Sequence, residues 1–153
     1  MPRTAPPSQP SPPALLLDNQ LCFALYSTSL AMTKLYKPLL DALGLTYPQY
    51  LVMLVLWEQD GSTVSALGER LFLDSGTLTP LLKRLQTSGL VERVRDAQDE
   101  RRVRITLTPQ GQALRAAAER IPACMLHSAA RPLPEVRALT IQLQGLRDQL
   151  SAR

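Results

Sequence analysis

Residues 60–111 read DGSTVSALGERLFLDSGTLTPLLKRLQTSGLVERVRDAQDERRVRITLTPQG, and this stretch decides the fold. It predicts a short helix at about 65–73, a tight turn at Asp74-Ser75-Gly76, and a second helix that runs to Ser88 and ends at Gly89. Two short helices joined by a tight turn make a helix-turn-helix. Four leucines at helical spacing give the second helix a core face: Leu78, Leu81, Leu82 and Leu85.

The other side of this second helix carries groups suited to DNA. Hydroxyls in its early turns can bond base edges, and two cations further along can hold phosphates. These candidate DNA-binding residues are Ser75, Thr77, Thr79, Lys83 and Arg84. Pro80 conflicts with this assignment, because local rules would start the helix at Thr79 with Pro80 in the first position.

A charged hairpin follows the two helices. Residues 90–95 and 102–107 alternate as strands do, and Asp96-Ala97-Gln98-Asp99 links them. A hairpin with an arginine-rich tip directly after a helix-turn-helix is a wing, and a solvated charged face is the alternative. The wing residues expected at DNA are Arg93, Arg95, Asp99, Arg101 and Arg102.

Helices are expected on both sides of this module. Residues 16–42 have helical apolar spacing, with Asp18 available as N-cap, Pro38 expected to bend or interrupt the helix, and Gly44 ending it. Thr46-Tyr47-Pro48-Gln49 has the spacing of a capping box ahead of a buried helix through Tyr50–Trp57.

After the wing, Thr108-Pro109 predicts a helix at 109–121, and Pro122, Pro132 and Pro134 break up the stretch before a last helix at about 135–151. That helix carries an apolar stripe of Val136, Leu139, Leu143, Leu146 and Leu150. Such a stripe suits a homodimer interface, because helix-turn-helix proteins usually read paired half-sites. Ordinary packing on the same chain is the alternative.

Length, charge and hydropathy limit the classes of function that the chain can have. A chain of 153 residues with a net charge of +4 is the size of one domain and weakly favours an anionic partner. No apolar run is long enough to span a membrane, and residues 1–13 (MPRTAPPSQPSPP) lack the apolar centre of a signal peptide, so we expect a cytoplasmic protein. The expected organisation is a disordered proline-rich arm at 1–14, a helical dimerisation region at 15–45 and 109–153, and a DNA-binding lobe at 46–108.

Cys22 lies near the start of the first predicted helix. At about 100° per residue, Tyr36 lies fourteen positions on and within about 40° of the direction of Cys22. The positive end of the helix dipole favours thiolate, the form that peroxides oxidise. A redox-sensing thiol is therefore one interpretation, and a buried core cysteine is the other.

Cys124 is the second cysteine. The pair does not resemble a secreted disulfide framework, and neither it nor His127 has metal-ligand spacing, so no metal or cofactor is expected. In a reducing compartment the two cysteines are either structural thiols or a regulated redox couple.

The module at 60–111 resembles the winged-helix core of the MarR family of bacterial transcription regulators, most specifically in the DER at 99–101 and the ITLTPQG that follows it. Cys22, LYKPLL at 35–40, LTYPQYLVMLVLWE at 45–58 and DSGTLTPLLKRL at 74–85 resemble the organic hydroperoxide resistance (OhrR) branch of that family. The resemblance covers about residues 15–150.

The resemblance implies a homodimeric repressor, not an enzyme, that leaves a palindromic DNA operator when organic hydroperoxides oxidise its cysteine. It implies that Cys22 is the sensing thiol, hydrogen-bonded by Tyr36 and Tyr47 of the opposite subunit. It maps the wing arginine that enters the minor groove to Arg101, supported by Asp99. It also implies that Cys124, near the end of the fifth helix, is the resolving thiol of a two-cysteine member.

Two other functions are alternatives to this one. A MarR-type repressor that releases DNA on binding a small aromatic acid would need a pocket between the dimer helices and the DNA lobe, and would leave Cys22 replaceable. A thiol peroxidase would turn over hydroperoxide, but no thioredoxin-like βαβ pattern or CxxC surrounds Cys22.

Overall fold

The computed structural model describes residues 10–153, and the chain divides into two compact units, 1–34 and 35–153. Residues 1–9, most of the expected proline-rich arm, lie outside the described residues. Short 3₁₀ turns form at Pro13–Leu15 and Leu17–Asn19 (η1 and η2), and the first of them includes the last two residues of the expected arm.

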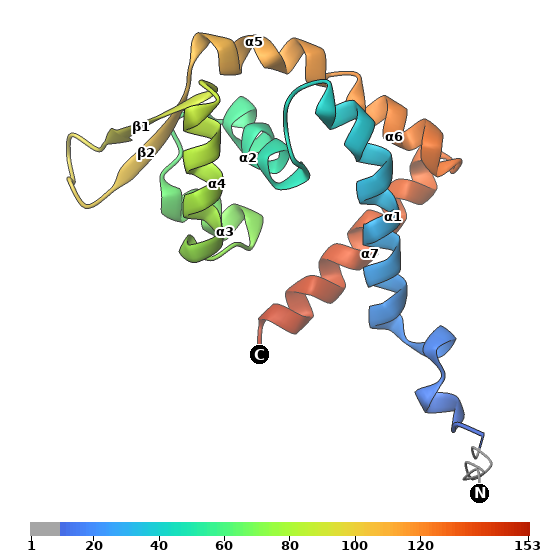
Figure 1. Ribbon diagram of the computed structural model, residues 1–153. Coiled ribbons are helices and arrows are strands. Elements are labelled where there is room, and N and C mark those ends of the chain that lie inside the picture. The colour runs from blue at the N-terminus through green and yellow to red at the C-terminus, as the bar shows by residue number, and fades with distance from the viewer. Residues whose placement is uncertain (1–9) are drawn as a thin grey trace, which may run out of the picture. The chain divides into compact units, whose positions relative to one another are not determined.

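Helix α1 spans Leu21–Asp41 and contains the boundary between the two units (Figure 1). The sequence predicted Asp18 as the N-cap of this helix. That prediction is wrong, because Asp18 lies inside η2. Pro38 does not end the helix either. Proline cannot donate a hydrogen bond to the carbonyl four residues back, which here belongs to the exposed Lys34, the last residue of the first unit. Water can solvate that carbonyl, so the helix tolerates the loss.

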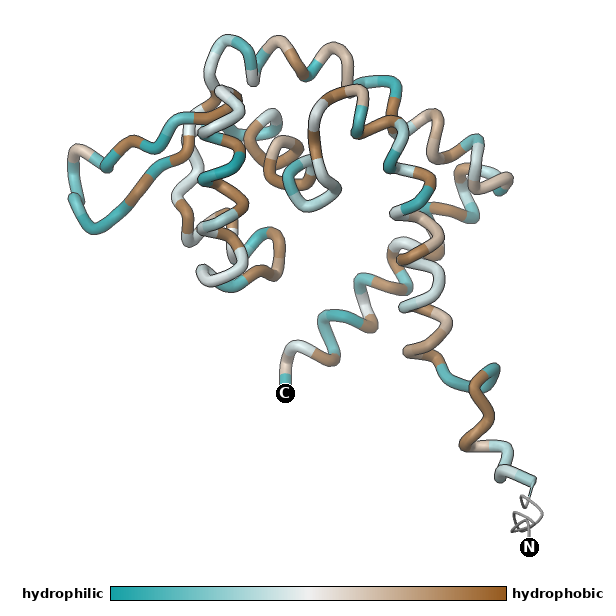
Figure 2. Tube along the Cα trace, viewed as in Figure 1, coloured by the Kyte–Doolittle hydropathy of each residue, from teal (hydrophilic) through white to brown (hydrophobic). Residues whose placement is uncertain are grey.

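Helix α2, Tyr47–Glu58, is the centre of the core of the second unit. Thr46 and Gln49 form the predicted capping box, in which the Gln49 amide proton is donated to Thr46 Oγ1 and Gln49 Oε1 accepts from the Thr46 amide. Val52, Met53 and Leu56 are almost completely buried, and Figure 2 shows α2 as a largely hydrophobic segment. The predicted buried helix is therefore confirmed.

Helices α3, Val64–Leu71, and α4, Ser75–Thr87, form the predicted helix-turn-helix. Asp74 caps α4 by accepting the Thr77 amide proton at 2.7 Å, so the helix starts at Ser75 and carries Pro80 inside it. The local rule that begins the helix at Thr79 is wrong here, because the Asp74 cap already starts the helix at Ser75. The carbonyl that Pro80 leaves unbonded belongs to the exposed Gly76, which water can solvate.

Strands β1, Val91–Arg95, and β2, Val103–Leu107, pair antiparallel with Val91 opposite Leu107. The base of this hairpin is tied to the segment before α3, since the Ile105 amide donates to the Ser62 carbonyl at 2.9 Å. The hairpin extends beyond the helix-turn-helix in Figure 1, and its tip is hydrophilic in Figure 2. The predicted winged helix-turn-helix is confirmed.

Three helices follow the wing: α5 at Pro109–Ala118, α6 at Ile121–Ala129 and α7 at Leu133–Ser151. Helix α6 was not expected from sequence. Pro122 was expected to break the chain, but it occupies the first turn of α6, where a missing N–H costs little. Over residues 10–153, no helix combines the length and apolarity that a bilayer crossing requires.

Candidate nucleic-acid interface and redox centre

Helix α4 presents the polar face that its sequence predicts. Ser75, Thr77, Lys83 and Arg84 are exposed, while Thr79 is half-buried. Four leucines hold the opposite face in the core, Leu78, Leu81, Leu82 and Leu85. The backbone and side-chain hydrogen bonds from Thr77 hold the pKa of the Asp74 carboxyl below its ordinary value, so the cap stays charged at neutral pH.

The wing tip is held by its aspartates. Asp96 Oδ1 accepts from the Gln98 amide and Asp96 Oδ2 from Arg104 Nε, which lowers the pKa of that carboxyl. Arg104 also donates to the Gly61 carbonyl at 2.9 Å. Arg104 therefore fastens the hairpin to the body of the unit, a role that the sequence did not reveal.

Asp99 orders the turn that carries Arg101. Its Oδ1 accepts the Arg101 amide proton at 3.1 Å, and its Oδ2 lies 3.8 Å from Arg102 Nε. Arg101 is exposed, and within residues 35–153 it forms no ion pair. Arg95, at the end of β1, is also exposed. The Arg101 guanidinium is consequently available to an anion outside this unit.

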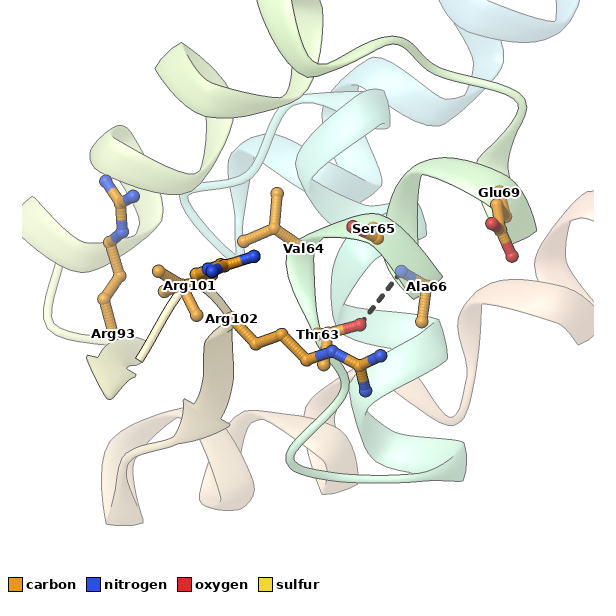
Figure 3. Close-up of a pocket in the computed structure, with 9 residues that line it drawn as sticks. Thr63, Val64, Ser65, Ala66, Glu69, Arg93, Arg101 and Arg102 are labelled. Atoms are coloured by element: carbon orange, nitrogen blue, oxygen red, sulfur yellow. Dashed lines mark hydrogen bonds between the residues drawn. The ribbon is translucent and has the colours of Figure 1, made fainter. Parts of the chain in front are cut away.

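A cleft of about 370 Å³ lies between the wing and the start of α3. Arg101 and Arg102 extend from the wing toward Thr63 and Val64 (Figure 3), and Arg93 also lines the cleft. Thr63 caps α3 by accepting the Ala66 amide proton at 3.1 Å. The cleft thus joins three guanidinium groups to the positive end of a helix, a setting that favours an anion such as a DNA phosphate.

Cys22 is the second residue of α1 and is exposed. It is not part of a core within its own unit, because none of the described residues of that unit is buried. The alternative of a buried core cysteine is therefore not supported in the single chain. Cys22 belongs to the first unit and Tyr36 and Tyr47 to the second, so their contact stays a prediction.

Tyr36 and Tyr47 lie together in the second unit. Their ring centroids are 4.9 Å apart, and both side chains are half-buried. Burial, with smaller contributions from Tyr47 and Tyr50, raises the pKa of Tyr36 to about 12, and burial also raises the pKa of Tyr47. Both phenols therefore stay protonated and able to donate a hydrogen bond at any physiological pH.

Tyr50 is a third member of this cluster that sequence reasoning missed. It is only 3% exposed, and its ring centroid lies 6.0 Å from that of Tyr36 and 6.4 Å from that of Tyr47. On its other side it meets Trp57 edge-on at 6.5 Å. The spacing of Tyr47, Tyr50 and Trp57 along one helix could have predicted a shared aromatic face.

Cys124 is half-buried inside α6, between the buried Ile121 and Met125. The expectation that it lies near the end of the fifth helix, in a stretch broken by prolines, needs correction. Helix α5 ends at Ala118, and Cys124 occupies a regular helix of its own that Pro122 starts.

Residues 34–117 match the family model of the SarA/Rot transcriptional regulators. The chain belongs to this winged-helix family. It fits a MarR-like, OhrR-type regulator, being 49% identical over 134 residues to the organic hydroperoxide resistance transcriptional regulator of Bacillus subtilis, with 88% of this chain and 91% of that protein covered. It is also 52% identical over 137 residues to the regulator TtmR of Methylorubrum extorquens, covering 90% of this chain and 70% of that protein.

The regulator is also similar to solved structures of AbfR from Staphylococcus epidermidis. Reduced AbfR bound to DNA matches with a TM-score of 0.74 and 40% identity over 88% of this chain and 93% of AbfR. A disulfide-formed AbfR matches with a TM-score of 0.63 and 41% identity over 85% and 91%. These neighbours share the winged helix-turn-helix fold seen here.

Proposed function

We propose that the chain is a cytoplasmic, homodimeric repressor that leaves its operator when an organic hydroperoxide oxidises Cys22. The observation that carries this proposal is the pairing of Tyr36 and Tyr47. Their protonated hydroxyls make no hydrogen bond within residues 35–153 and are free to donate to an acceptor from elsewhere. Cys22 of the partner subunit supplies that acceptor, as its sulfur is exposed in the first turn of α1.

The chemistry is a two-electron oxidation of the thiol. The Cys22 thiolate attacks one oxygen of the hydroperoxide, the O–O bond breaks, and a sulfenic acid and an alcohol result. Phenol donors stabilise the attacking thiolate. The Cys124 thiol then attacks the sulfenic sulfur, forming a disulfide and releasing water. The disulfide form of the related AbfR supports this second step.

DNA binding is assigned to the second unit. The hydroxyls of α4 suit base edges in the major groove, and Arg101 suits the negative potential of a narrow minor groove. Phosphates fit the cleft lined by Arg93, Arg101 and Arg102, with Lys83, Arg84 and Arg95 as further phosphate contacts. The DNA complex of AbfR supports this assignment.

Homodimerisation is supported by apolar side chains that the chain leaves uncovered. In the first unit these include Leu21, Phe23, Leu25 and Leu30, and on α7 they include Leu139, Leu143 and Leu150. A second copy would bury these surfaces and set the two copies of α4, the proposed recognition helix, at the spacing of a palindromic operator.

The test is a gel shift on a duplex that the protein selects from a random pool, before and after cumene hydroperoxide. Wild type should release the duplex. Cys22→Ser should bind it equally well and not release it, because serine cannot form a sulfenic acid. Release of Cys22→Ser at the wild-type peroxide concentration would overturn the proposal. Displacement by an aromatic acid without peroxide would favour a ligand-responsive repressor.

Two further variants test the partners of the thiol. Tyr36→Phe and Tyr47→Phe should slow Cys22 oxidation, followed by stopped flow, and leave reduced DNA binding intact. On non-reducing electrophoresis, wild type should give a covalent dimer that dithiothreitol reverses and that Cys124→Ser abolishes. A band of monomer size that carries the bridge would place the disulfide within one chain.

A further inference from the structure

Trp57 is the only tryptophan of the chain and connects two parts of the second unit. Its Nε1–H donates to the Gly111 carbonyl at 3.0 Å, across 54 positions of sequence. Its ring packs against Tyr50, which in turn packs against Tyr36 and Tyr47. A continuous row of aromatic rings therefore leads from the paired phenols to the first turn of α5.

Gly111 is held tightly where the recognition helix meets the wing. A Cβ on this residue would collide with the Leu90 carbonyl oxygen, so no side chain fits. Thr108, the cap of α5, fixes the same place, since its Oγ1 donates to the Gly89 carbonyl at 2.6 Å and its amide to the Leu90 carbonyl at 3.1 Å. Gly89 and Leu90 are two of the three residues between α4 and β1. A movement of Gly111 must therefore move the end of α4 or the base of the wing.

We propose that Tyr50 and Trp57 are positioning residues that pass the displacement of Tyr36 and Tyr47 on to Gly111, and so to the junction between the recognition helix and the wing. This inference rests on the proposed function, in which oxidation of Cys22 removes the acceptor of the two phenols. Close-packed side chains transmit small shifts because they have no free volume to absorb them. The indole hydrogen bond makes the last link directional, since it fixes the Gly111 peptide relative to the ring.

The key variant is Trp57→Phe, which keeps an aromatic ring and removes the N–H donor. In its reduced state it should bind the selected duplex within about threefold of wild type, and its Cys22 should oxidise at the wild-type rate. The loss of DNA affinity on oxidation should be at least tenfold smaller than in wild type. Tyr50→Phe is the matched control, because it keeps the ring contacts and loses only a hydroxyl, and it should release DNA as wild type does.

The single indole supplies a second readout in the unaltered protein. Oxidation by cumene hydroperoxide should shift the tryptophan emission of wild type, and the shift should be absent in Cys22→Ser, which controls for direct oxidation of the indole. This measurement tests the inference even where Trp57→Phe folds poorly.

The outcomes separate the two proposals. If oxidation releases DNA from wild type with no change in emission, or if Trp57→Phe releases DNA as fully as wild type, the aromatic row is structural only and the redox repressor stands. If hydroperoxide does not release DNA from wild type, the proposed function fails and the inference fails with it. A shifted emission together with impaired release in Trp57→Phe supports both.

Discussion

Helices α2 and α7 both carry apolar residues, but they have opposite surroundings in the chain. Helix α2, Tyr47–Glu58, buries five residues in the core. Helix α7, Leu133–Ser151, is longer and buries none, although Leu139, Leu143 and Leu150 form an apolar stripe. The second unit buries the residues of α2 in its own core, whereas the stripe of α7 stays exposed, and the proposed dimer would cover it.

The largest effect should come from the core around α2. Leu82→Ala removes a side chain that is 1% exposed and leaves a cavity, so the free energy of unfolding should fall by about 2–5 kcal/mol. Urea unfolding followed by circular dichroism measures the loss. A decrease below 1 kcal/mol would mean that the lobe is loosely packed and the comparison with α7 is wrong.

A smaller effect, on assembly, is expected from α7. Leu139→Asp puts a charge in place of a stripe residue that is 48% exposed in the single chain, so the dimer dissociation constant should rise on the order of a hundredfold, about 3 kcal/mol. Sedimentation measures it, while the fold of the lobe should stay intact. Gln144→Asp, an exposed position on the opposite side of the same helix, is the control and should stay dimeric. An unchanged dimer in Leu139→Asp would place the interface elsewhere.

Arg101→Ala tests operator binding without changing the hydrophobic core. The side chain is exposed at the wing tip, so folding should be unaffected, while operator binding should weaken by about 1–3 kcal/mol. Fluorescence anisotropy at fixed salt measures the affinity, with the exposed Arg137→Ala of α7 as a control of equal charge. If both variants lose the same operator affinity, Arg101 contributes only through the net charge of the protein.

The smallest effect concerns pH. Because the pKa of Tyr36 is raised to about 12 in the folded chain, its unfolded form ionises first as pH rises above 10. The free energy of unfolding should therefore fall between about pH 10 and 12, and Tyr36→Phe should show a shallower fall. Alkaline urea titrations of both proteins compare the slopes, and identical slopes would mean that the phenol is solvated.

Much of the winged helix-turn-helix was predictable because its sequence signals are short-range. Thr46 and Gln49 lie three positions apart, and the side chain of each accepts a hydrogen bond from the backbone amide of the other. At the Asp60-Gly61 turn, the positive φ of 78° falls on a glycine, which adopts it without strain. Each of these choices depends on a few neighbouring residues, so the sequence alone carries them. The same applies to the polar face of α4 and the arginines of the wing.

Proline placement shows where local rules fail. Pro80 and Pro38 lie inside helices. Pro122 lies in the first turn of α6, where the sequence analysis expected it to break up the chain. In the first two cases the carbonyl left unbonded is on an exposed residue, so the cost is small, and only the folded chain reveals which carbonyls water can reach.

By itself, therefore, the sequence determined the helix-turn-helix, the capping box of α2, the hairpin, and the polar residue types on α4 and the wing. The tertiary structure alone decided which distant residues meet: Tyr50 with Tyr36, Trp57 with Gly111, and Arg104 with Gly61. It also decided that the stripe of α7 stays uncovered by its own chain. The physical reason is that caps and turns are satisfied within a few residues, whereas these contacts join segments that only the closing of the core brings together.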